Sequence, residues 1–100
     1  MRDYVYVADV AAANLLALRG ALEHRVLNVG TGVGITTRQL ATEIFRAARR
    51  EVPVRFAAAR AGDLERSVLD PTATLQALEA PLTSLARGLD LTLSWYESSV

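Results

Sequence analysis

Residues 2–10 read R-D-Y-V-Y-V-A-D-V, and residues 28–32 read N-V-G-T-G. The first stretch begins with aromatic and β-branched residues, which predicts a short strand over residues 2–7. Asp9 stands where the N-cap of a helix belongs, so a helix is expected from about residue 10 to residue 19. The second stretch places two glycines where an apolar segment turns into the next element. A strand, a helix and a glycine turn in this order are typical of an α/β chain.

The alternation of short strands and helices continues to the end of the chain. Further strands are expected at residues 25–29, 52–58 and 67–69. Further helices are expected after the capping box of Thr36 and Gln39, after Asp70-Pro71, and after Thr83 or Ser84. Gly20 should end the first helix, and Pro53 favours an edge position for its strand, because proline lacks the backbone N–H that a ladder uses. We therefore expect an α/β fold in which short strands alternate with about four helices.

The composition narrows the classes of function. Eleven Arg residues balance eleven Asp and Glu residues, and the chain has no Lys, no Cys and a single His. A chain without net charge has no general attraction for nucleic acid or for an anionic membrane. Neither a disulfide framework nor a Cys or multi-His metal site is expected from these counts. With no long apolar run and no export signal in the sequence, a cytoplasmic location is predicted.

The glycine turn at residues 30–34, G-T-G-V-G, lies between an expected strand and an expected helix, as a dinucleotide-binding fingerprint would. That fingerprint is G-x-G-x-x-G. Here the residue three positions after Gly32 is Ile35, and the residue three positions after Gly34 is Thr37. The match fails, and a structural turn is predicted instead of a phosphate loop.

Residues 60–63 read R-A-G-D and allow two interpretations. Arg60 presents a planar guanidinium that can bind phosphate oxygens in pairs, and the carboxylate of Asp63 can accept from both hydroxyls of a ribose. Alternatively, the loop is solvated and Arg60 pairs with Asp63 or Glu65. Taken alone, the four residues favour the solvated loop, since surface ion pairs are common and weak.

In combination, these segments resemble the extended short-chain dehydrogenases, the NAD-dependent epimerases and dehydratases of sugar nucleotides. R-D-[FY]-V, N-V-G-T-G and R-x-G-D occur in that order. The resemblance implies a Rossmann-like fold, of which residues 1–100 would form a single carboxy-terminal, substrate-binding segment. It implies that Arg60 and Asp63 hold the UDP group of a UDP-sugar, with Arg2 on the diphosphate. The short R-x-G-D form is typical of the epimerases, so the implied parent reaction is 4-epimerisation of a UDP-hexose through a transient keto sugar.

The residues for the redox chemistry of that family are missing from the chain. The family's Tyr-x-x-x-Lys pair cannot exist in a sequence without Lys, and the glycine fingerprint is absent. The resemblance implies NAD as the cofactor of the parent enzyme, whereas this chain alone is expected to have no catalytic residue, no bound NAD and no activity. Association with a missing amino-terminal NAD-binding part, or a homo-oligomer, is expected. Two alternatives stay open: a stand-alone binding or interaction module that has lost catalysis, and a segment of another reductase or dehydratase of the superfamily.

Overall fold

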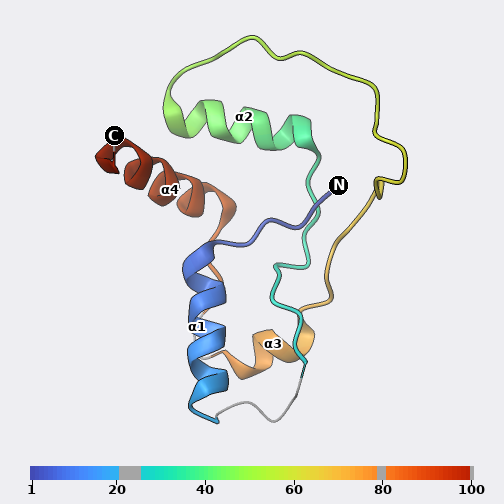
Figure 1. Ribbon diagram of the computed structural model, residues 1–100. Helices are drawn as coiled ribbons and strands as arrows, with labels where there is room; N and C mark the ends of the chain where they lie inside the picture. The colour runs from blue at the N-terminus through green and yellow to red at the C-terminus, as the bar shows by residue number, and fades with distance from the viewer. Residues whose placement is uncertain (21–25, 79–80, 100) are drawn as a thin grey trace.

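A computed structural model describes residues 1–20, 26–78 and 81–99. Four helices form in this part of the chain: α1 (Val7–Leu18), α2 (Thr37–Ala48), α3 (Thr72–Ala77) and α4 (Leu85–Ser99). Helices α2 and α4 pack against each other, while α1 runs away from them with α3 beside it (Figure 1). A long arc, residues 50–66, leads from the end of α2 around the outside of the molecule (Figure 1). Membrane-spanning length and apolarity are found in none of the helices described.

The predicted strands do not form in the described residues, and in their place the structure has two isolated bridges at Arg2. Arg2 pairs antiparallel with Ile35, through N–H···O bonds of 2.9 Å in both directions, and parallel with Ser67. Residues 52–58 have no regular structure, and neither do residues 26–29, while residue 25 lies outside the described part. A strand exists only where a neighbour pairs with it over several residues, and each of these segments meets a described neighbour at one residue or none. The expected alternation of strands and helices is therefore corrected to a helical arrangement with point contacts.

Helix α1 begins three residues before its predicted start. Its N-cap is Tyr6, which makes no side-chain capping bond, and Asp9 lies inside the first turn of the helix. The prediction that Asp9 caps the helix was wrong, because its carboxylate is engaged elsewhere, as described below. Gly20 has φ +70°, so the predicted glycine stop after the helix is confirmed.

The capping signals of α2 and α4 act as the sequence predicts. Thr36 Oγ1 accepts from the N–H of Gln39 at 3.1 Å, and Gln39 Oε1 accepts from the N–H of Thr36 at 2.8 Å. At the start of α4, Ser84 Oγ accepts from the N–H of Arg87 at 3.2 Å, which selects Ser84 of the two expected caps. Local spacing was sufficient for these helix starts because both partners lie within one turn.

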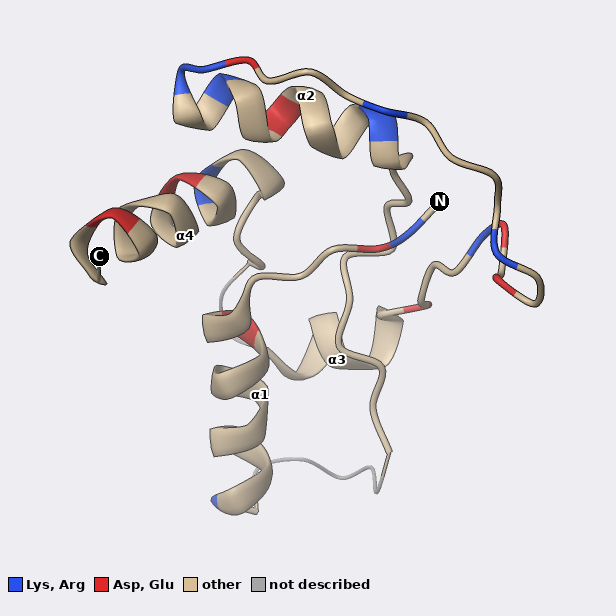
Figure 2. Ribbon diagram, turned by 45° about the horizontal axis from the view of Figure 1, so that its top comes forward, with Lys and Arg blue, Asp and Glu red and all other residues tan. Residues whose placement is uncertain are grey.

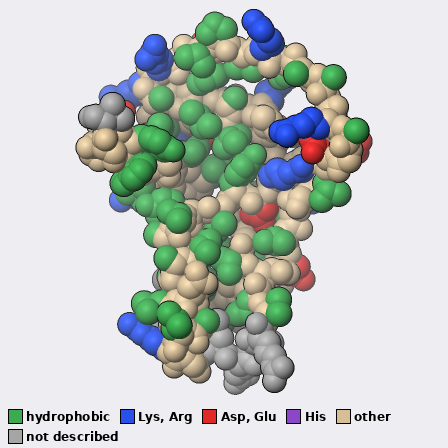
Figure 3. All heavy atoms as spheres, in the orientation of Figure 1, with side chains coloured by type: hydrophobic (Ala, Val, Ile, Leu, Met, Phe, Trp, Pro, Cys, Tyr) green, Lys and Arg blue, Asp and Glu red, His purple; other side chains and the backbone are tan. Residues whose placement is uncertain are grey.

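The described residues bury little of their apolar surface. Among the described residues, the buried side chains are Ala13, at 5% exposure, Thr74, at 2%, and Pro71. The accessible surface is 8063 Å², whereas a compact monomer of this mass exposes about 5,500 Å². The radius of gyration is 15.8 Å, against about 13 Å for a compact chain of this length. Figure 3 shows the apolar side chains spread across one face of the molecule. Large exposed apolar residues include Val7, Leu18, Val33, Phe56, Leu64 and Trp95.

Candidate nucleotide-binding site

The carboxylate of Asp3 joins three segments near the amino terminus. Its Oδ1 accepts from Thr31 N at 2.9 Å and from Thr31 Oγ1 at 2.6 Å, and its Oδ2 accepts from Gly32 N at 2.9 Å and from Leu69 N at 3.4 Å. Desolvation raises the pKa of Asp3, but the hydrogen bonds from Thr31, Gly32 and Leu69 together outweigh it and leave the pKa below its ordinary value. The ionised carboxylate is thus the form that holds the junction together. The sequence interpretation of Asp3 as a structural residue agrees with these contacts.

The glycine turn at residues 30–34 is packed against this junction. A Cβ on Gly30 would lie 2.8 Å from Asp3 Oδ2, and a Cβ on Gly34 would lie 2.6 Å from Cγ2 of Val68. The backbone N–H groups of Thr31 and Gly32 both donate to Asp3, so they are not free to bind a phosphate. Close packing and donors that are already engaged do not fit a pyrophosphate cradle, and the turn is structural, as the failed fingerprint predicts.

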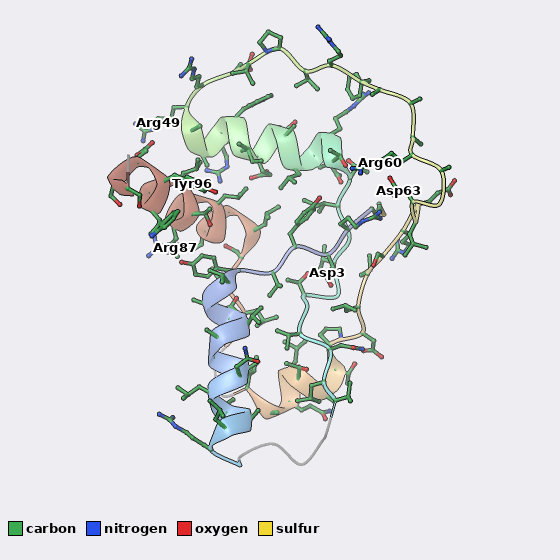
Figure 4. All side chains as sticks on the ribbon, in the orientation of Figure 1. Asp3, Arg49, Arg60, Asp63, Arg87 and Tyr96 are labelled. Atoms are coloured by element: carbon green, nitrogen blue, oxygen red, sulfur yellow. The ribbon has the colours of Figure 1, made fainter. Side chains whose placement is uncertain are left out.

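The loop at residues 60–63 forms a tight turn on the outer arc. The N–H of Asp63 donates to the carbonyl of Arg60 at 3.2 Å, and Gly62 has φ +85° with open space around it. Arg60 Nε lies 3.8 Å from Asp63 Oδ2, with the two side chains 90% and 55% exposed. Figure 4 shows both side chains on the arc, away from Asp3. This long, exposed pair is the solvated arrangement that the four residues alone favour, and it leaves both groups accessible to a ligand.

Arg2 lies where the arc returns to the amino terminus. Its guanidinium donates to the carbonyl of Met1 at 2.9 Å, and the backbone N–H of Ser67 donates to the same carbonyl at 2.9 Å. The amino group of Met1 donates to the carbonyl of Glu65 at 2.5 Å. The arc is thus tied to Arg2 at its end, but Arg2 and Arg60 share no hydrogen-bonding partner among the residues described.

Arg66 is a second cation at this junction, and sequence reasoning did not single it out. Its Nη1 lies 3.2 Å from the sulfur of Met1, which brings a guanidinium close to the residue that Arg2 also contacts. Arg66 lies outside the R-x-G-D motif, so no spacing in the sequence pointed to it. Figure 2 shows that charged residues gather on α2, α4 and the arc, whereas α1 and α3 are nearly uncharged.

Two neighbouring apolar hollows lie beside the Asp3 junction. One of about 330 Å³ extends from Thr31 and Val33 to Leu85, and one of about 290 Å³ extends along α4 to Leu89. They share Tyr4, Thr83, Ser84 and Leu85. The residues that line the two hollows are mostly apolar, and their polar side-chain groups are the hydroxyls of Thr, Ser and Tyr. The hollows can therefore hold an apolar group, but their lining contains no Asp, Glu, His or Cys side chain for catalysis. In the described part of the chain, no cluster of three His, Asp or Glu residues could hold a metal ion.

Curated proteins at 31–39% identity align with 71% to 97% of this chain. The chain belongs to the extended short-chain dehydrogenases, in the epimerase and dehydratase family, and matches its carboxy-terminal part. The relatives concerned are UDP-glucose 4-epimerases. That of Mycolicibacterium smegmatis is 39% identical over 98 residues, which cover 97% of this chain and 31% of that protein.

The similarity extends to distant organisms. The UDP-glucose 4-epimerase of Bos taurus is 33% identical over 93 residues, covering 90% of this chain and 26% of that protein. That of Bacillus subtilis is 34% identical over 74 residues, covering 71% of this chain and 22% of that protein. The chain thus spans between about a fifth and a third of the length of these relatives. No family model matches the chain, and no solved structure matches it.

Proposed function

We propose that this chain is the sugar-nucleotide-binding segment of an NAD-dependent epimerase, and that Arg60, Asp63 and Arg2 bind the UDP group. One observation carries the proposal: a chain that aligns over 97% of its length with a UDP-glucose 4-epimerase presents R-A-G-D as a turn with both charged side chains exposed. A buried or strongly paired Arg60 would argue against a ligand-binding role. Arg60 Nε lies 3.8 Å from Asp63 Oδ2, and the Arg60 side chain is 90% exposed. A ligand can therefore easily replace Asp63 as the partner of Arg60.

The two charged groups of the turn have different partners in this proposal. Arg60 turns from Asp63 to the phosphate oxygens, where its planar fork makes paired charge-assisted hydrogen bonds. Asp63, released from Arg60, accepts from the ribose hydroxyls. Gly62 at φ +85° has no side chain and nothing near it, so the backbone can approach the nucleotide closely.

Arg2 supplies a second guanidinium for the diphosphate, and Arg66 at the same junction can supply a third. A diphosphate that leaves water needs more than one cationic partner. Both arginines are held near Met1, so a movement of the arc toward the amino terminus would bring Arg60 to the same ligand. The substrate would thus close the arc onto the junction at Arg2.

The chemistry of the epimerase would take place on another part of the enzyme. NAD would accept the hydride from the sugar and return it, and its binding would fall to an amino-terminal part, with residues 1–100 acting as the substrate-binding unit. The role of this chain is then to bind and orient the nucleotide. The surface left open here, roughly 2,500 Å² beyond that of a compact monomer, is of the size that permanent partners bury.

The test is UDP binding by the chain alone and after fusion downstream of the NAD-binding part of a related epimerase. We expect weak binding alone and stronger binding in the fusion, because the rest of the pocket preorganises the site. Arg60→Ala should weaken UDP binding in the fusion. Arg87→Ala, which removes an arginine from α4 far from the arc (Figure 4), is the matched control. Equal UDP affinities for the wild-type fusion, its Arg60→Ala variant and its Arg87→Ala variant would disprove the substrate assignment.

A further inference from the structure

The arc between α2 and the turn at Arg60 has few connections to the rest of the molecule. Residues 51–59 make no hydrogen bond and no ion pair in the described part of the chain. They run outside α2 (Figure 1), and each of them is exposed. The position of the arc therefore depends on its two ends and on the side-chain contacts along it.

The aromatic ring of Phe56 makes one such contact, with Arg38 in the first turn of α2. The guanidinium carbon of Arg38 lies over the ring, 4.9 Å from its centre, within the distance at which a cation is attracted to the face of an aromatic ring. Among the described residues, no carboxylate forms an ion pair with Arg38. Phe56 is 69% exposed, so no apolar cluster holds its ring in place. The contact with Arg38 thus ties the middle of the arc to the start of α2.

The start of α2 is itself tied to Arg2. Ile35 exchanges two backbone hydrogen bonds of 2.9 Å with Arg2, and Arg38 follows Ile35 by three residues, across the capped start of the helix. On the arc, Arg60 follows Phe56 by four residues, which is at most about 14 Å of chain. The contact between Arg38 and Phe56 therefore links the turn at Arg60 to the segment that pairs with Arg2.

We propose that Arg38 is a positioning residue for the nucleotide. Through the ring of Phe56 it keeps the turn at Arg60 near the junction at Arg2, from which two guanidinium groups can bind one diphosphate. This role rests on the proposed UDP site, and it adds to that site a residue outside the R-x-G-D motif.

The contact acts by shortening the part of the arc that moves freely. Without it, the free part extends from Arg50, whose N–H is bound at the end of α2, to residues 65–67, which are bound to Met1. With it, the free part begins at Phe56. Arg60 then has fewer positions to sample and loses less conformational freedom when UDP binds.

Arg38 has a second way to act on the ligand, which the Phe56 ring distinguishes from the first. Stacking uses the face of the guanidinium and leaves its in-plane N–H groups free to donate. A phosphate bound directly to Arg38 would use these groups and would not need the ring. A positioning Arg38 has no effect on affinity once the ring is removed, whereas a phosphate-binding Arg38 keeps its effect.

A double-mutant cycle in UDP affinity tests the role, both in the chain and in the fusion described above. Phe56→Leu keeps an apolar side chain without the ring, and Arg38→Gln removes the charge but keeps a good helix former. Each should weaken UDP binding about two- to fivefold, and the double variant should bind no more weakly than either single variant. Phe56→Tyr keeps the ring and should restore wild-type affinity. Arg87→Gln, the same loss of charge on α4 (Figure 4), is the matched control.

Proton NMR of the free chain tests the contact without any ligand. The side-chain protons of Arg38 should be shifted upfield by the Phe56 ring, and the shift should disappear in Phe56→Leu while the helical circular dichroism is unchanged. Absence of this shift in the wild type would overturn the contact. Wild-type UDP binding with unchanged affinity in the variants, or losses that add in the double variant, would overturn the positioning role and leave the UDP site standing. Wild-type proteins that bind no UDP, alone or fused, would overturn both proposals.

Discussion

Asp9 and Thr83 are 74 residues apart in the sequence and are joined by two hydrogen bonds: Asp9 Oδ2 accepts from the N–H of Thr83 at 2.8 Å, and Oδ1 accepts from its hydroxyl at 2.9 Å. They connect the first turn of α1 to the residues that lead into α4. Two bonds to one ionised group fix the direction in which the chain enters α4.

We expect this pair to show coupling in a double-mutant cycle. Asp9→Ala and Thr83→Val each remove the side-chain bond, and the coupling free energy should be about 0.5–3 kcal/mol. Urea unfolding followed by helical circular dichroism gives the four stabilities. A cycle through Asp9 and Thr92, which is bonded to Gly88 and not to Asp9, is the control and should show additive effects. Additivity for Asp9 and Thr83 would contradict the expectation.

The carboxylate of Asp3 should make the fold sensitive to acid. Because its pKa is lower in the folded chain than its ordinary value of 3.8, its stabilising contribution is full at neutral pH and is lost as the pH falls through the lowered pKa. Asp3→Asn should destabilise the chain at pH 7 by about 1.5–3 kcal/mol, and the difference from wild type should shrink in acid.

Hydrogen exchange of the Thr31 and Gly32 amides measures this effect locally. Exchange at both amides should be faster in Asp3→Asn, since both donate to the missing carboxylate. Glu97→Gln, an exposed change near the end of α4, is the control. Unchanged protection at Thr31 in Asp3→Asn would show that the junction does not depend on this charge.

Gly34 should tolerate alanine only when its neighbour is reduced in size. The added Cβ would lie 2.6 Å from Cγ2 of Val68, and its next neighbour is the Cβ of Met1 at 3.5 Å. Gly34→Ala should cost about 1–3 kcal/mol through overpacking. Adding Val68→Ala removes the clashing methyl and should restore part of that loss, as thermal unfolding would show. A double variant less stable than the sum of the two single effects would contradict this account.

Asp63 should control the choice of sugar in the nucleotide. If its carboxylate accepts from the ribose hydroxyls, Asp63→Ala in the fused protein should lower UDP affinity more than dUDP affinity, because dUDP lacks one hydroxyl. Arg60→Ala should instead weaken both nucleotides alike, about ten- to a hundredfold for a charge-assisted contact. Calorimetric titration of both nucleotides measures the two ratios. The same loss for UDP and dUDP in Asp63→Ala would remove the ribose contact from the proposal.

The sequence predicted the features whose partners are close in the chain. The capping box of Thr36 and Gln39 and the stop at Gly20 depend on one helical turn each, and both are confirmed. The glycine turn was predicted to be structural because the dinucleotide motif fails there. The reason that the turn needs glycine is that Asp3 and Val68 lie close to Gly30 and Gly34, and these contacts join segments far apart in the sequence. The role of Asp9 was missed for the same reason, since its partner is Thr83.

The strands could not be predicted from local residues because a strand depends on its neighbours. Residues 2–7 and 52–58 have the composition of strands, but the described chain offers the first a partner at one residue and the second none. For the site, the Arg60–Asp63 pair agrees with the local interpretation, while the UDP contacts of Arg60, Asp63 and Arg2 remain predictions.

The sparse core also determines how this chain responds to temperature. A domain of 100 residues gains about 1.2–1.5 kcal/mol/K of heat capacity when it unfolds, mainly because apolar surface becomes hydrated. Here many large apolar side chains are exposed in the folded chain and none is fully buried among the described residues, so the increment should be below that value. The remainder would appear on association, as a negative heat-capacity change that grows with the apolar area covered. Cold would then loosen the assembly more than it loosens the chain itself.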